Sequence, residues 1–148
     1  MKKHLAIDIG ASSGRHILGW VEDGKIQLKE IYRFDNSQIV RNGHDCWDIE
    51  RLVASVKAGI DAAMAKAEIA SIGLDTWGVD FGYIASDGSL LGLPRAYRDP
   101  YTDGIPEELF KIVPRQEIYT RTGIQIMYFN SLYQLYAAKK EEYSALRH

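Results

Sequence analysis

The sequence predicts an α/β protein whose mixed sheet begins with three antiparallel strands. Apolar residues alternate along three runs at the start of the chain, and Asp23-Gly24, between the second and third runs, is a strong two-residue hairpin signal. An amphipathic helix over residues 49–67 then leads into another short apolar run, residues 69–75. Because a strand, a helix and a strand in this order usually form a right-handed parallel crossover, we expect the last run to lie parallel to the first.

The N-terminal strands are expected over residues 5–9, 15–21 and 26–34. The polar stretch 35–45 that follows is expected to run across the surface. Asp48 is a good N-cap for the helix, because its side chain accepts hydrogen bonds from backbone amides of the first turn. The apolar positions of that helix are Ile49, Leu52, Val53, Val56, Ile60, Ala63, Met64 and Ala67.

Turn residues and short helices follow in the second half of the chain. Residues 81–85 and 90–93 are expected to form a hairpin around a Ser-Asp-Gly-Ser turn. Helices are expected over residues 103–112 and 114–121, with Pro114 in a first helical turn. A longer helix is expected over residues 131–147, with Leu132, Leu135, Tyr136, Lys139 and Tyr143 along one side. The order β-β-β-α-β with a meander first is the start of a ribonuclease H-like layout, and the sheet is expected to be unfinished at residue 148.

Composition narrows the classes of protein to consider. The 148 residues include 46% hydrophobic and 26% charged residues, as in one globular domain, and the net charge of −2 provides no basic field for nucleic acid or an anionic membrane. We find neither a membrane-spanning run nor a secretory signal, and Cys46 is the only cysteine, so a reducing cytoplasmic location is the simplest interpretation. Cys46 is expected to be a small core residue. The four histidines have no metal-ligand spacing, so no transition-metal site is assigned.

The stretch LAIDIGASSGRHILGW suggests an anion site. Asp8 lies near the end of the first strand and a loop of small residues follows, so backbone amides could approach phosphate oxygens closely. Asp75 ends the parallel strand and is expected at the same edge of the sheet, where ligands bind in open α/β proteins. Asp8 near a Mg²⁺ ion would remove the repulsion between carboxylate and phosphate. The alternative is a plain tight hairpin, with Asp8 capping backbone groups.

Two further stretches carry candidate binding residues. In IGLDTWGVDFGY, Gly78 would let a ligand approach the backbone and Trp77 offers a flat apolar face of the kind on which sugars stack. The alternative is a strand bulge at Gly78 and core filling by Trp77. In AYRDPYTDG, Arg98 and Asp99 are read in isolation as an exposed surface ion pair.

Together these stretches resemble the N-terminal part of an FGGY-type carbohydrate kinase, most closely the members that act on L-rhamnulose. The matching segments are DIGASSGR, SIGLDTWGVDF, GLPRAYRD, IYTRTGIQ and FNSLYQL, in the family's order and over nearly the whole chain. The resemblance implies the actin-like ATPase superfamily, with two ribonuclease H-like domains about a cleft, and transfer of the γ-phosphoryl group of ATP to the sugar. Residues 1–148 would then be the N-terminal part of the first domain, with the second domain absent from this chain.

The resemblance also implies roles for individual residues. Ala11, Ser12, Ser13, Gly14 and Arg15 match the loop that binds the ATP phosphates. Asp8 matches the acidic residue near Mg²⁺, Gly78 matches a sugar contact, and Trp77, Asp99 and Phe129 match positions close to the sugar. The general-base aspartate of the family lies in the part missing here, and neither Asp75 nor Asp80 replaces it. We therefore expect the chain alone to be inactive, and its unfinished sheet to favour self-association.

Other functions remain open from the sequence. Another FGGY kinase, acting on xylulose, fuculose, ribulose or glycerol, would share the DIG opening. A non-catalytic binding or assembly module would keep the fold without the chemistry. Only the ribonuclease H-like layout suggests nucleic-acid binding, and the net charge argues against it.

Overall fold

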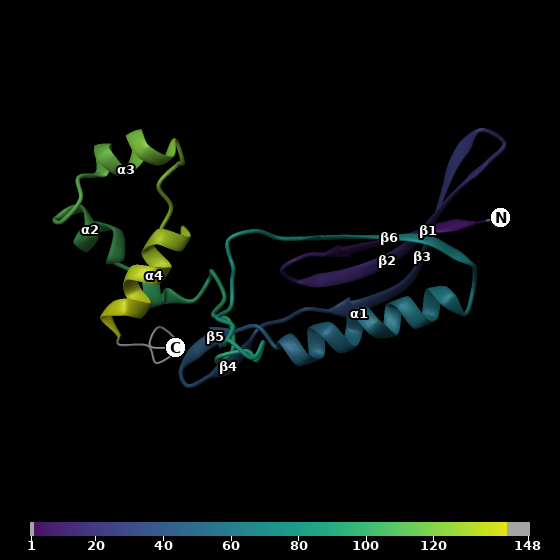
Figure 1. The fold of residues 1–148 in the computed structure, drawn as a ribbon, viewed down its shortest axis with the longest axis horizontal. Helices are drawn as coiled ribbons and strands as arrows, with labels where there is room; N and C mark the ends of the chain where they lie inside the picture. Colours follow the sequence, from purple (N-terminus) through teal and green to yellow (C-terminus); the bar gives the residue numbers. More distant parts are fainter. Residues whose placement is uncertain (1, 142–148) are drawn as a thin grey trace. The chain divides into compact units, whose positions relative to one another are not determined.

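The computed structural model describes residues 2–141, which fold as two compact units (Figure 1). Within these residues, the first unit comprises 2–38 and 48–78, and the second comprises 39–47 and 79–141. The end of the longest predicted C-terminal helix, residues 142–147, lies outside the described residues.

The first unit is built on a four-stranded mixed sheet with the strand order β3-β2-β1-β6. Its strands are β1 (Lys3–Ile9), β2 (Ser13–Glu22), β3 (Lys25–Asp35) and β6 (Ile69–Thr76). β2 pairs antiparallel with both β1 and β3, and β6 pairs parallel with β1. The predicted meander and the parallel crossover are therefore confirmed.

The turn between β2 and β3 follows the predicted hairpin signal. Asp23 has φ 50° and Gly24 has φ 74°, so both residues adopt the left-handed conformation. A type I′ turn needs positive φ at both central positions, and its twist matches that of the two strands.

The helix α1 (Ile49–Met64) covers one face of this sheet (Figure 1). Asp48 is its N-cap, and the Asp48 Oδ1 atom accepts a 3.0 Å hydrogen bond from the amide of Arg51. The helix ends before residue 67, where the sequence predicted its end. Between α1 and the sheet lies a buried core of Leu5, Ile7, Ile9, Leu18, Phe34 and Ala63.

His16 is the buried polar residue beneath α1. Its ring is fully shielded from solvent, and its Nε2 atom lies 3.1 Å from the carbonyl oxygen of Val56. The ring fits because residue 59 is a glycine: a Cβ atom there would lie 2.2 Å from His16 Cε1. Burial lowers the pKa of His16, which favours the neutral imidazole.

The second unit begins with a short hairpin that the sequence analysis missed. β4 (Ile39–Arg41) pairs antiparallel with β5 (His44–Cys46) across Asn42 and Gly43, both with positive φ. Residues 39–45 are exposed or partly exposed, as expected for the polar surface stretch 35–45, but the sequence analysis assigned no strands to them. Asn-Gly is a type I′ turn signal, but strands of three residues each are too short to give a clear apolar alternation.

The predicted hairpin over residues 81–93 forms only in part. Ile84 and Leu90 make an isolated bridge, and the Ala85 amide donates to the carbonyl oxygen of Ser89 across the expected turn. The flanking residues do not form strands within the described structure.

Short helices make up the rest of the second unit. They are η1 (Pro100–Thr102), α2 (Ile105–Phe110), α3 (Arg115–Thr122) and α4 (Ser131–Lys140). Pro114 is the N-cap residue of α3, one position before the predicted first turn. Ile105, Leu109, Ile118, Tyr133 and Ala137 form the core of this unit. The buried side of α4 is Tyr133, Gln134, Ala137 and Ala138, whereas Leu132 and Leu135, on the predicted side, are 44% and 43% exposed.

Asp99 is a buried acceptor in the second unit, so its interpretation as an exposed ion pair is wrong. The residue is 1% exposed, and its carboxylate accepts hydrogen bonds from the amides of Asp45 (2.7 Å) and Tyr101 (3.0 Å). The Nδ1 atom of His44 lies 3.1 Å from the same carboxylate. Asp99 thus joins β5 to η1, and these bonds offset the cost of burying its charge.

Cys46 is buried in β5, as expected for a small core residue. Burial raises the pKa of its thiol, so the reactive thiolate is disfavoured. None of the helices within residues 2–141 is long and apolar enough to cross a membrane.

We expect Gly59→Ala to destabilise the protein, although alanine favours an ordinary helix by about 1 kcal/mol. The added methyl group would overlap the His16 ring, and overpacking of this kind costs about 1–3 kcal/mol in the free energy of unfolding. Denaturant unfolding followed by circular dichroism measures the change. Gly73→Ala is the matched control, because nothing lies within 4 Å of its added Cβ. Equal stability of the two variants would contradict the packing described for His16.

Candidate functional site

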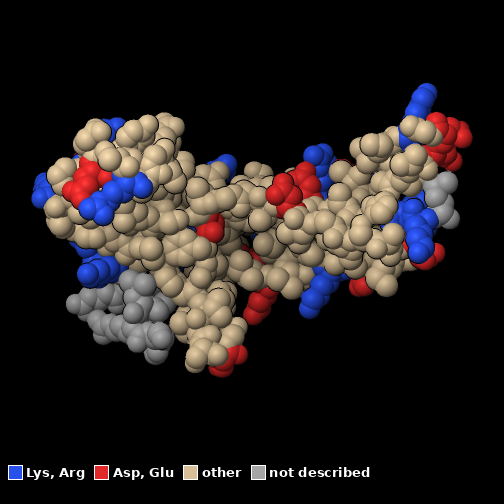
Figure 2. All heavy atoms as spheres, turned by 45° about the horizontal axis from the view of Figure 1, so that its top comes forward, with Lys and Arg blue, Asp and Glu red and all other residues tan. Residues whose placement is uncertain are grey.

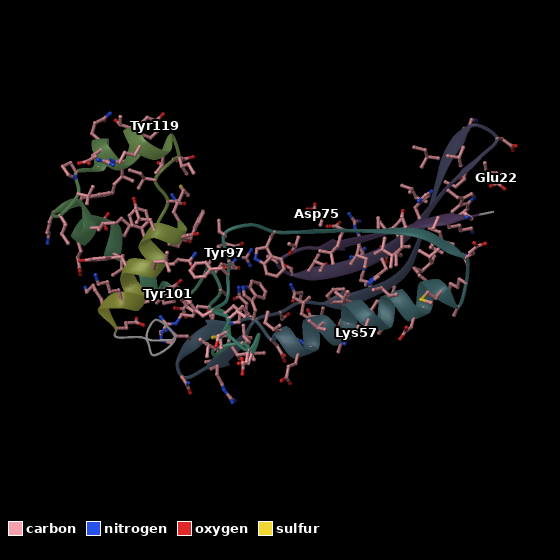
Figure 3. The ribbon with its side chains drawn as sticks, in the orientation of Figure 1. Glu22, Lys57, Asp75, Tyr97, Tyr101 and Tyr119 are labelled. Carbon is pink, nitrogen blue, oxygen red and sulfur yellow. The ribbon has the colours of Figure 1, made fainter. Side chains whose placement is uncertain are left out.

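The register of β1 and β6 brings two carboxylates to one edge of the sheet. Asp8 is the direct partner of Asp75 in the parallel ladder, which confirms the prediction that both lie at the same edge of the sheet. Both lie on the face opposite α1, because the alternate residues Ile7 and Ile9 are buried on the α1 face. Asp75 is exposed and projects from β6 on the side away from α1 (Figure 3). The edge therefore presents negative charge to solvent.

Arg15 balances the charge of Asp8. It is the antiparallel partner of Asp8 across β1 and β2, and its Nε and Nη2 atoms both lie 2.9 Å from Asp8 Oδ2. The side chains are 46% and 49% exposed, so the pair contributes at most about 1 kcal/mol to stability. The guanidinium that the sequence predicted to contact phosphate lies against the Asp8 carboxylate in this structure.

The loop between β1 and β2 turns several carbonyl groups toward the protein. The Gly10 amide donates to the carbonyl oxygen of Ser13 at 2.9 Å, which closes the turn. Asn36, which follows β3, donates from its backbone amide to the Ser12 carbonyl oxygen at 3.0 Å and from Nδ2 to the Gly10 carbonyl oxygen at 2.9 Å. The amides of Ala11 and Ser12 have no acceptor among the described residues. This arrangement leaves two backbone donors available for an anion.

Gly14 is required by the core. It is buried in β2, and a Cβ atom at this position would lie 2.1 Å from the ring of Phe34. The packing of Phe34 on the α1 face of the sheet is therefore sufficient to explain a glycine at position 14.

The two residues of the predicted sugar contact differ in their packing. Trp77 is partly buried and packs against the core of the first unit, which favours the core-filling alternative for at least part of its ring. Gly78 has no positive φ, and nothing among the described residues lies within 4 Å of an added Cβ. The described structure thus gives no internal reason for glycine at position 78.

Asp80, Asp99 and Phe129 belong to the second unit. The Asp80 Oδ2 atom accepts a 2.7 Å hydrogen bond from the Nε1 atom of Trp47, which is itself buried. The Phe129 ring packs edge-on against Tyr97 with their centroids 5.7 Å apart. Asp80 and Asp99 therefore both have structural partners within their own unit.

A small cavity in the second unit is too small for a sugar. Its volume is about 20 Å³, which suits one water molecule. In its lining, the Tyr101 hydroxyl donates a hydrogen bond to Gln134 Oε1. Burial raises the pKa of Tyr101 above its ordinary value. No group of three or more metal-ligating side chains is found in the described part of the chain.

Asn36 is the site residue that the sequence analysis missed. The sequence shows that Asn36 directly follows a predicted strand. Only the pairing of β2 with β3 shows that it lies beside the loop between β1 and β2. A polar residue at the end of a strand is a weak signal without that pairing.

Comparisons with known proteins agree with the fold and the family. Residues 4–147 match the model of the N-terminal domain of the FGGY family of carbohydrate kinases. The chain is 49% identical to a rhamnulokinase from Bacteroides thetaiotaomicron over 99% of its own length and 30% of the relative's. It is 45% identical to a rhamnulokinase from Oceanobacillus iheyensis, covering 92% of this chain and 29% of the relative. The chain thus spans about 30% of the length of these relatives.

Solved structures share the same fold. A ligand-bound xylulose kinase from Lactobacillus acidophilus superposes with a TM-score of 0.84 at 19% identity, over 100% of this chain and 30% of that one. A gluconate kinase from the same organism gives a TM-score of 0.83 at 19% identity, over 99% of this chain and 30% of that one. The mixed sheet with its helices thus has the ribonuclease H-like layout that the element order predicted, in agreement with the actin-like ATPase fold that the family resemblance implied. From its first strand through α4, the chain belongs to the FGGY family of carbohydrate kinases.

Proposed function

We propose that this chain is the N-terminal portion of an ATP-dependent rhamnulokinase, which converts L-rhamnulose and ATP into L-rhamnulose 1-phosphate and ADP in rhamnose breakdown. The observation that carries the proposal is the 49% identity to a protein named rhamnulokinase over nearly the whole chain. A cytoplasmic location would suit an enzyme that consumes ATP. Other FGGY kinases are a weaker alternative, because the solved xylulose and gluconate kinases are only 19% identical to this chain.

In this proposal the edge of the first unit holds the phosphates of ATP. The amides of Ala11 and Ser12 donate to phosphate oxygens, and Ser13, Gly14 and Arg15 complete the loop. Asp8 and Arg15 form a weak exposed pair, so Arg15 could exchange its carboxylate for phosphate. The residues fit a Mg²⁺ ion held mostly by water and phosphate, because Asp8 is half-exposed beside Asp75 and few other ligands are near. Mg²⁺ would neutralise charge on the transferred phosphoryl group.

Gly78 and Trp77 are proposed to contact the sugar. The open space around the Cα atom of Gly78 supports a close approach of a ligand to the backbone there. Removal of the proton from the sugar hydroxyl needs a general base. Asp80 is engaged by Trp47, and Asp75 lies beside Asp8 at the proposed phosphate edge, so neither is assigned this role.

A nucleic-acid or purely structural role has less support. On the face drawn in Figure 2, basic and acidic side chains are interspersed and do not form one basic stripe. A non-catalytic module would need no phosphate-binding loop, and it therefore predicts no response to ATP·Mg²⁺.

We expect this chain to bind its ligands without turning them over. ATP·Mg²⁺ and L-rhamnulose should each raise the melting temperature in differential scanning fluorimetry, while a coupled assay detects no sugar-dependent release of ADP. Asp8→Asn should weaken binding of ATP·Mg²⁺ about tenfold, the order expected for loss of one charge-assisted interaction, and leave L-rhamnulose binding unchanged.

Asp87→Asn serves as the control, because Asp87 is an exposed aspartate in the turn of the second unit. An unchanged melting temperature with both ligands would favour the non-catalytic module. Sugar-dependent turnover by the chain alone would refute its proposed inactivity.

We also propose that two copies of the chain associate through β6. Among residues 2–141 this strand is an edge of the sheet, with Ile72 50% exposed and Leu74 58% exposed. The opposite edge, β3, carries several charged side chains that discourage pairing, whereas the charged residue of β6 is Asp75 alone. A second copy can pair with β6 symmetrically, as in an isologous dimer.

Sedimentation equilibrium tests this pairing. We expect a concentration-dependent dimer whose dissociation constant rises about tenfold in Ile72→Lys, because a lysine must then be buried or displaced at the new interface. Ile26→Lys on β3 is the matched control, since Ile26 is also an exposed isoleucine on an edge strand. A monomer at all concentrations, or equal effects of both substitutions, would refute pairing through β6.

A further inference from the structure

Asn36 is a buried polar residue beside the β1–β2 loop. It is 4% exposed and follows β3 directly, next to the pairing of Ser13 with Asp35. Its backbone amide donates to the Ser12 carbonyl oxygen at 3.0 Å, which extends the β2–β3 pairing past its last register position. The side chain is thereby held under the loop, where no solvent competes for its hydrogen bond.

The side chain of Asn36 determines the orientation of one peptide group in the loop. Its Nδ2 atom donates to the Gly10 carbonyl oxygen at 2.9 Å. A peptide group is planar and trans, so this carbonyl and the N–H group of Ala11 point in opposite directions. Because the carbonyl points toward buried Asn36, the Ala11 N–H group points away from it.

The Ala11 amide is one of the donors left available by the loop. It has no acceptor among residues 2–141, and Ser12 beside it is exposed. A backbone donor held in one direction binds an anion better than one in a mobile loop, because less conformational entropy is lost on binding. Without the Asn36 side chain the Gly10–Ala11 peptide could rotate, and its carbonyl dipole could face the anion instead.

We propose that Asn36 is a positioning residue that aims the Ala11 amide at a phosphate group; this inference rests on the loop's proposed role in binding nucleotide phosphates. Asn36 acts through the Gly10–Ala11 peptide, and its own side chain stays bonded to the loop. The ligand class is a phosphate oxyanion, which accepts hydrogen bonds from backbone N–H groups.

The test is a titration of the whole chain with inorganic phosphate at constant ionic strength, followed by the ¹H–¹⁵N NMR signals of Ala11 and Ser12. Asn36→Ala removes the side-chain donor and keeps the backbone bond to Ser12. We expect it to weaken phosphate binding about five- to tenfold, as the loss of one hydrogen bond would, and to move the Ala11 signal even before phosphate is added.

Asn130→Ala is the matched control, because Asn130 Nδ2 donates to the carbonyl oxygen of Gln125 at 2.8 Å in the second unit. Both substitutions remove one side-chain hydrogen bond to a loop carbonyl, and a purely structural role of Asn36 predicts a lower melting temperature with unchanged phosphate affinity. If Asn36→Ala loses the dispersed spectrum of a folded protein, Asn36→Ser replaces it, since the shorter side chain stays polar but does not reach Gly10.

The outcomes separate this inference from the function on which it rests. Phosphate-dependent shifts of Ala11 in the wild-type chain, weakened by substitution of Asn36 and not of Asn130, support it. The same shifts with unchanged affinity in the Asn36 variants overturn the positioning role and leave the phosphate-binding loop standing. If the Ala11 and Ser12 signals of the wild-type chain do not shift with phosphate, both the positioning role of Asn36 and the phosphate-binding loop are overturned.

Discussion

The parallel pairing of β1 with β6 is the constraint on which the site depends. It places Asp75 beside Asp8, and the antiparallel pairing of β1 with β2 places Arg15 on the other side of Asp8. All three side chains lie on the face that α1 does not cover, because alternate residues of β1 fill the core. A slip of one residue in either pairing would turn the charges into the core and the apolar residues to solvent. The hydrophobic effect that holds α1 on the sheet therefore also specifies the register of the charged edge.

Two glycines, which have no side chain, allow two aromatic rings to pack between α1 and the sheet. Gly59 admits the ring of His16 beneath α1, and Gly14 admits the ring of Phe34 at the start of β2. The centroids of these two rings lie 6.1 Å apart, and Phe34 pairs with Gly14, the second residue of β2. Close packing makes a protein interior resist deformation. The loop thus starts from a rigid base, and buried Asn36 adds the hydrogen bonds that orient its peptide groups. A site that binds a small anion gains from such preorganisation, because little conformational entropy remains to be lost.

Much of the first unit could be predicted from sequence, since its strands are long enough for apolar alternation and its turn carries the Asp23-Gly24 signal. The expected parallel crossover also predicted that Asp8 and Asp75 lie at the same edge of the sheet, whereas their direct pairing is known only from the structure. The second unit was harder to predict. The hairpin around Asn42 has strands too short for a periodic pattern, and Asp99 is buried only because amides distant in sequence converge on it. The role of Asn36 depends on the same kind of long-range contact, which no local pattern records.

We propose that the loop after β1 presents its backbone amides to phosphate while Arg15 is released from Asp8. A crystal structure of the chain with ADP and Mg²⁺ tests it most directly. We expect phosphate oxygens at hydrogen-bond distance, about 3 Å, from the amide nitrogens of Ala11 and Ser12, with the Arg15 guanidinium turned from the carboxylate toward the nucleotide. Nucleotide bound elsewhere, with the Asp8–Arg15 pair intact and the two amides facing only solvent, would contradict it.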